Sequence, residues 1–166
     1  LNRAIVHQGL KVLKKKKNLG LKTLIEVSNI ENNITSYHLG YILGPRINAG
    51  GRVGKSTHGA NLLLNKDAKD SFKLAVDLNT YNKERQILES ELLKKILNTE
   101  YKNSTDPVII LHGENWHEGV IGIIAARMKE KFNKPAIIIS INNGVGKGSG
   151  RSIHGFDLGS TVIGGV

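Results

Sequence analysis

The residues best suited to bind a phosphate lie in a glycine-rich segment, residues 44–52. Its candidate side chains are Arg46, Asn48 and Arg52. An arginine binds a phosphate through two parallel N–H donors, and glycines let the main chain turn without the steric penalty of a Cβ. We predict an irregular loop here, because residues 35–43 favour a short helix that Gly44 would close and Pro45 would stop. The structural alternative is an ordinary surface loop whose arginines form ion pairs.

A second glycine-rich segment has glycine at every second position from residue 144 to residue 150. Alternate residues of an extended strand share a face, so the other face would carry Lys147, Ser149 and Arg151. Such a face suits a nucleic-acid backbone, and Gly150 would allow a close approach. The alternative is an edge strand softened by glycine, with a solvated basic face.

Residues 112–118 join a predicted strand to a predicted helix, where free amide groups would form an anion site. His117 is a candidate phosphate ligand, and Trp116 is a candidate stacking surface for a base. Each has a structural alternative: His117 as a helix cap, and Trp116 as a core anchor, which is the commoner place for a lone tryptophan. His117-Glu118 also begins a zinc-protease motif, but Ile121 stands at its second histidine, so that site is excluded.

Residues 49–56 match a relaxed form of the P-loop of nucleotide-binding proteins, with Lys55 and Ser56 in the phosphate and magnesium roles. The strict motif requires glycine at Ala49 and a buried strand directly before the loop. The preceding residues instead contain Gly44 and Pro45, which are unsuited to such a strand. The sequence therefore disfavours an NTPase.

In order and spacing these motifs resemble the RecJ family of single-strand-specific exonucleases, from about Leu39 to Leu158. Gly-Pro-Arg-Ile-Asn-Ala-Gly-Gly-Arg is similar to one family signature, in which alanine is more usual at Gly50. Gly-Ser-Gly-Arg-Ser at residues 148–152 is similar to the signature of the DHH-associated domain. The resemblance implies that single-stranded DNA is bound by a set of residues from these motifs, namely Arg46, Asn48, Arg52, Ser149, Gly150 and Arg151, with Trp116 and His117.

The resemblance also implies where hydrolysis takes place. In the family, two Mn²⁺ or Mg²⁺ ions lie in an N-terminal DHH domain among aspartates and paired histidines, and the enzyme digests DNA from 5′ to 3′ in repair and recombination. No Asp-His-His triplet occurs here, so we assign no catalytic or metal-binding residue and expect this chain alone to hydrolyse nothing. The alternatives are a related phosphodiesterase for short RNA or cyclic dinucleotides, and a non-catalytic scaffold that binds nucleic acid.

Composition agrees with a polyanionic partner. The chain has 24 Lys and Arg against 14 Asp and Glu, a net charge of +10, although many soluble proteins are also basic. The absence of cysteine excludes disulfides and thiolate metal sites. No apolar run has the length of a membrane span, so we expect a cytoplasmic protein. Because the chain begins with Leu1 and not with Met, and stops at Gly164-Gly165-Val166, we expect it to be part of a longer polypeptide.

The expected fold is α/β, with a helical N-terminal part and a small parallel or mixed sheet flanked by helices, incomplete at the C-terminus. We place a helical connector with the arginine segment at residues 1–55 and the DHH-associated domain at 56–166. Apolar periodicity predicts helices at 2–17, 21–27, 57–64, from 67 to 96, and at 118–132, and Asp67 is expected to cap the long helix that follows it. Strands are expected at 108–111, 136–141 and 146–153, the first two parallel and buried on both faces. We further expect Arg46 and Arg151 to border a common trough.

Overall fold

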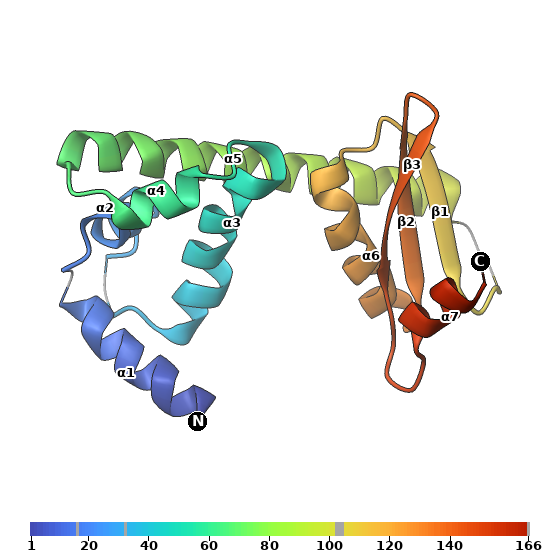
Figure 1. Ribbon diagram of the computed structural model, residues 1–166, viewed down its shortest axis with the longest axis horizontal. Helices are drawn as coiled ribbons and strands as arrows, with labels where there is room; N and C mark the ends of the chain where they lie inside the picture. Colours follow the sequence, from blue (N-terminus) through green and yellow to red (C-terminus); the bar gives the residue numbers. More distant parts are fainter. Residues whose placement is uncertain (16, 32, 102–104, 166) are drawn as a thin grey trace. The chain divides into compact units, whose positions relative to one another are not determined.

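The computed structural model describes residues 1–15, 17–31, 33–101 and 105–165, and the chain divides into two compact units, Leu1–Arg85 and Gln86–Val166. The division falls inside the longest helix. In chain order the elements are α1 (Asn2–Lys14), α2 (Leu19–Val27), the π-helix η1 (His38–Leu43), α3 (Gly44–Val53), α4 (His58–Leu64), α5 (Ala68–Lys95), the π-helix η2 (Ile96–Glu100), β1 (Ile109–Glu114), α6 (Glu118–Phe132), β2 (Ala136–Asn142), β3 (Val145–Arg151) and α7 (Leu158–Gly164) (Figure 1). The predicted α/β fold, helical first and then strand, helix and strand, is confirmed.

The regular secondary structure of the first unit is helical in its described residues. Its buried core is formed by Leu24, Ile25, Ile34, Leu43, Leu62, Ala75 and Leu78. Asn18 begins α2, because its side-chain oxygen accepts from the Leu21 amide at 2.9 Å while its Nδ2 donates to the Leu63 carbonyl at 2.9 Å. The helices α2 and α4 approach so closely that a Cβ on Gly20 would overlap the carbonyl oxygen of Leu62. A single cap thus both starts α2 and ties it to the end of α4.

The boundaries of the N-terminal helices differ from those predicted. The first helix ends at Lys14, three residues earlier than expected, and the predicted continuation through Lys16 lies outside the described residues. The helix α2 begins two residues earlier than expected, because Asn18 caps it. By contrast the predicted cap of α5 is confirmed, with the Asp67 carboxylate accepting from the Asp70 amide at 2.9 Å.

The arginine segment is a helix, and the prediction of an irregular loop is wrong. The π-helix η1 runs directly into α3, with both Leu43 and Gly44 in helical conformation. Pro45 stands in the first turn of α3, where the fixed φ of proline is compatible with a helix. Glycine disfavours a helix by about 1 kcal/mol per residue, but tertiary packing outweighs that cost here: Gly50 is buried, and a Cβ there would lie 3.2 Å from Leu78 of α5.

The second unit contains a three-stranded sheet in the order β1-β2-β3. The strands β1 and β2 are parallel, with Ile109 paired to Ala136, which confirms the predicted crossover through α6. The strands β2 and β3 form an antiparallel hairpin closed by Asn143 and Gly144, both with positive φ (51° and 75°). An Asn-Gly pair is the typical sequence of a two-residue turn of this kind. Because one strand pair is parallel and the other is antiparallel, the sheet is mixed.

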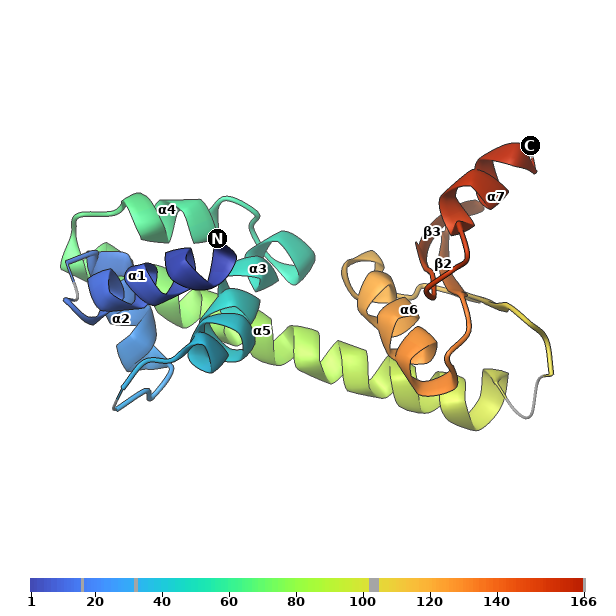
Figure 2. The same ribbon diagram turned by 90° about the horizontal axis from the view of Figure 1, so that it is seen from below.

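Burial alternates along the strands, and the expectation of a sheet buried on both faces is wrong for the described residues. Ala136, Ile138 and Ser140 are buried on the face that α6 covers. On the other face Gly150 contacts Leu158 of α7, while Ile110 remains 59% exposed. Figure 2 looks along the strands and shows α6 and α7 on opposite sides of the sheet. The apolar runs 109–111 and 136–139 suggested burial on both faces, but here α6 and the end of α5 cover only one face.

The core of this unit lies between that face, α6 and the C-terminal part of α5. Its buried members are Leu92, Ile96, Ile109, Trp116, Val120, Ile121, Ile124, Ala125, Met128, Ala136 and Ile138. An exposed ion pair, Arg127 Nε to Glu89 Oε1 at 3.2 Å, links α6 to α5 at its edge. No helix among the described residues is both long and apolar enough to span a membrane.

Candidate nucleic-acid interface

Arg46 is held in a fixed orientation by the first unit. Its Nε donates to Asn79 Oδ1 of α5 at 3.0 Å, and its Nη1 donates to the Ile42 carbonyl at 2.8 Å. These bonds engage two of the five guanidinium donors. Partial burial lowers the pKa of Arg46 from its ordinary value, but an arginine stays protonated at neutral pH. Its side chain is therefore a positioned cation that also joins α3 to α5.

Asn48 and Arg52 face solvent on α3. They are four residues apart, so they lie on one side of the helix, and both are exposed. Arg46 precedes Asn48 by two residues, which is about 200° around an α-helix. The structure therefore places Asn48 and Arg52 on one side of α3 and turns Arg46 toward α5. The sequence motif alone did not separate these two roles.

In the second unit, Ser149 and Arg151 lie together on β3. The predicted alternation is confirmed: Gly146, Gly148 and Gly150 face Ile137, Ile139 and α7, and the other face looks toward α6. On that face Arg151 Nη1 donates to Ser149 Oγ at 3.3 Å and to the Gly150 carbonyl at 2.7 Å. The guanidinium thus lies beside the hydroxyl, which gives a donor set that suits a phosphate oxygen.

A glycine of α6 makes room for this pair. A Cβ on Gly122 would lie 3.0 Å from Ser149 Oγ and 3.3 Å from Arg151 Nη2, closer than ordinary van der Waals contact. The missing side chain lets β3 carry a hydroxyl and a guanidinium where a larger helix residue would displace them. Gly122 is therefore a positioning residue for the Ser149–Arg151 pair.

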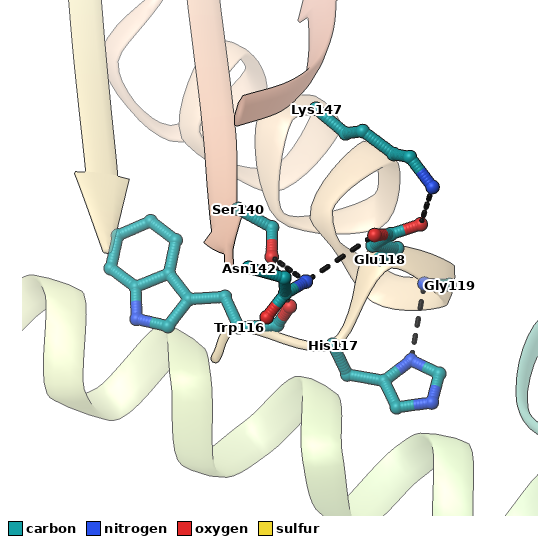
Figure 3. Close-up of polar contacts among 7 residues, drawn as sticks. All are labelled: Trp116, His117, Glu118, Gly119, Ser140, Asn142 and Lys147. Atoms are coloured by element: carbon teal, nitrogen blue, oxygen red, sulfur yellow. Dashed lines mark hydrogen bonds and ion pairs between the residues drawn. The ribbon is translucent and has the colours of Figure 1, made fainter. Parts of the chain in front are cut away.

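Lys147, the remaining cation on this face, is engaged by a carboxylate that sequence reasoning missed. Its Nζ contacts Glu118 Oε2 at 2.9 Å, and Asn142 Nδ2 donates to Glu118 Oε1 at 3.3 Å (Figure 3). The hydrogen bond from Lys147 lowers the pKa of Glu118 below its ordinary value. The only signal in the sequence is a Glu in the first turn of a helix, and finding its partner requires the register of the β2-β3 hairpin.

In the structure His117 caps α6 and Trp116 is buried in the core. The His117 Nδ1 accepts from the Gly119 amide at 3.1 Å and caps α6, with its ring directed away from the Glu118–Lys147 pair (Figure 3). Trp116 is only 5% exposed and packs over Gly113. A buried indole offers no open face to a base, so in this structure Trp116 anchors the core. His117 remains exposed at the helix start.

Comparisons with known proteins agree with the motifs. Residues 105–165 match the DHHA1 domain. Over 95% of its length the chain is 34% identical to the single-stranded-DNA-specific exonuclease RecJ of Bacillus subtilis (strain 168), of which it covers 20%. It is 35% identical to the protein of the same name from Escherichia coli (strain K12), of which it covers 29%. The predicted resemblance to RecJ is confirmed.

The solved structures give the same result. A crystal structure of RecJ from Thermus thermophilus in complex with Mg²⁺ matches with a TM-score of 0.86 and 29% identity, over 98% of this chain and 25% of that one. A crystal structure of exonuclease RecJ bound to manganese matches with a TM-score of 0.82 over 98% of this chain. The described residues hold no group of three or more His, Cys, Asp or Glu that could bind a metal ion. They therefore do not fit the metal ions of those two structures.

Proposed function

Because this chain is a RecJ-like segment that ends in a DHHA1 domain, we propose that it forms the strand-holding part of a single-stranded-DNA exonuclease. The chain spans about a fifth to three tenths of the length of the curated relatives it matches. Hydrolysis from 5′ to 3′ with Mn²⁺ or Mg²⁺ is assigned to a DHH domain elsewhere in the parent protein. The present residues bind and orient the strand.

The observation that carries this proposal is the Ser149–Arg151 pair on β3. In this pair Arg151 Nη1 lies 3.3 Å from Ser149 Oγ. The opposite face of β3 carries glycines in place of side chains, and Gly122 of α6 leaves space for the pair. Asn48 and Arg52 supply a second exposed donor set on α3. The net charge of +10 favours any polyanion, and each of these two sets could bind phosphates of a nucleic-acid backbone.

The test is binding of a fluorescein-labelled oligothymidine by the chain, followed by anisotropy at several salt concentrations. Arg52→Gln and Arg151→Gln should each weaken binding and reduce the slope of log affinity against log salt by about 0.7, the value for one phosphate contact on a single strand. Arg127→Gln is the matched control, since Arg127 is 56% exposed on α6 and outside both sets. Equal losses for Arg151→Gln and Arg127→Gln would refute the assignment, since overall charge alone would then explain binding.

A further inference from the structure

Two exposed tyrosines stand at the start of the helix that carries Asn48 and Arg52. Tyr37 is 60% exposed and Tyr41 is 73% exposed. Their rings stack on each other, with centroids 5.0 Å apart and planes inclined by 25°. A stacked aromatic pair that is left largely in water exposes a large apolar surface, which commonly marks a binding site.

The pair is held in place by local structure. Tyr37 directly precedes η1, whose start is fixed by His38: its Nδ1 lies 3.1 Å from the Thr35 amide and 2.8 Å from Thr35 Oγ1. The ring of His38 in turn meets Tyr37 edge-on at 5.9 Å. Short π-helices often occur at functional sites, and this one carries the exposed Tyr41 directly after the exposed Tyr37 at its N-cap.

The exposed surface continues from η1 along α3. Exposed positions recur at Tyr37, Tyr41, Asn48 and Arg52, while the intervening Leu43, Ala49 and Gly50 are buried. A Cβ on the exposed Gly40 or Gly51 would meet nothing within 4 Å. The aromatic pair and the two phosphate-binding candidates therefore lie along one open helical face. Asn48 follows Tyr41 by seven positions, which is roughly 10 Å along an α-helix axis.

The charge of the surrounding segment favours a polyanion over a protein partner of mixed charge. No Asp or Glu occurs between Glu31 and Asp67, whereas Arg46, Arg52 and Lys55 lie within that interval. Exposed aromatic rings next to cations are the usual combination in proteins that bind single strands, where bases stack and the backbone follows the positive charge.

We propose that Tyr37 and Tyr41 form a stacking platform for bases of a single-stranded nucleic acid whose phosphates contact Asn48 and Arg52. The inference rests on the proposed function and adds to it a second kind of contact, made to bases and not to the backbone. Because every base has a π face, the platform binds without sequence preference. Trp116, the stacking candidate expected from the sequence, is buried, so the two tyrosines are proposed to stack on bases in its place.

The test compares two probes of equal length, a labelled oligothymidine and a labelled strand of abasic sites with the same phosphates. The wild-type chain should bind the oligothymidine about tenfold more tightly, since stacking contributes this order per base. The double variant Tyr37→Leu/Tyr41→Leu should lose that preference and bind both probes as the wild type binds the abasic strand. Tyr37→Phe/Tyr41→Phe should keep the preference, because it keeps both rings.

Phe72→Leu is the matched control, since Phe72 is an exposed ring (60%) on α5 outside the proposed platform, and it should keep the preference. A leucine double variant that still prefers the oligothymidine, or that weakens both probes equally, would overturn the platform and leave strand binding through the arginines in place. Failure of the wild-type chain to bind either probe would instead overturn the proposed function and the platform with it. Circular dichroism of each variant verifies that the helices are kept.

Discussion

Replacing Glu118 by glutamine should strengthen the binding of single strands, although it touches neither of the proposed phosphate-binding pairs. In the structure the Glu118 carboxylate holds Lys147 Nζ at 2.9 Å on the face of β3 that carries Ser149 and Arg151. As long as this ion pair persists, Lys147 is neutralised within the protein. A glutamine of similar shape keeps the side-chain volume and releases one cation toward the strand.

The expected size follows from counting contacts. One freed lysine can neutralise one phosphate, which adds about 0.7 to the slope of log affinity against log salt for a single strand. Between 1 M and 50 mM salt, a slope of 0.7 corresponds to about an eightfold gain in affinity. The gain should therefore be greatest at low salt and vanish near 1 M.

The assay is oligothymidine binding by anisotropy across that range of salt. Glu91→Gln is the matched control, because Glu91 is exposed on α5 and its replacement changes the net charge by the same amount. The double variant Glu118→Gln/Lys147→Gln should lose the gain. If Glu118→Gln and Glu91→Gln behave alike, Lys147 is not released onto the strand and the reasoning is refuted.

The same ion pair predicts that the effect of Glu118→Gln on strand affinity is lost at low pH. The hydrogen bond from Lys147 lowers the pKa of Glu118 below the ordinary value of about 4.3. A carboxylate with a lowered pKa keeps its pair at all higher pH and loses it as the pH falls through that lowered pKa. The difference in affinity between wild type and Glu118→Gln should therefore be full from pH 6 to 8 and disappear only below about pH 4. A difference that already disappears near pH 6 would show that another group holds Lys147.

Two glycine substitutions separate stability from binding. Gly20→Ala should lower the free energy of unfolding by about 1–3 kcal/mol in urea, because the new methyl group overlaps the Leu62 carbonyl; Gly9→Ala, which meets nothing within 4 Å, should not destabilise, and equal behaviour of the two would contradict the close approach of α2 and α4. Gly122→Ala should weaken oligothymidine binding by displacing Ser149 and Arg151 while the unfolding midpoint holds or rises, since alanine favours a helix by about 1 kcal/mol. Unchanged binding by this variant would show that the pair does not need the space.

Local sequence was sufficient where the structure depends on nearest neighbours. The Asp67 cap, the helix at 118–132 and the β1-α6-β2 crossover follow from caps, apolar periodicity and the handedness of parallel connections. The alternation of glycine with Lys147, Ser149 and Arg151 follows from the period of two in a strand. These features need no knowledge of what packs against them.

The arginine segment shows why propensity misled. Each of its glycines and its proline disfavours a helix, so the sum of the individual propensities predicts a loop. The structure adds contacts from distant residues: Leu78 of α5 lies close against Gly50, and Asn79 binds Arg46. Packing of this kind overrides intrinsic preference, and it appears only once α3 and α5 are side by side.

The motifs alone determined the family resemblance, the basic character and the residue types that can hold a phosphate. Tertiary structure decided which of those residues are available: it buried Trp116, used His117 as a cap and paired Lys147 with Glu118. It also left the stacked Tyr37 and Tyr41 exposed at the start of η1. The physical reason is that a residue's chemistry is carried by its own atoms, whereas its exposure and its partners are set by segments far away in the chain.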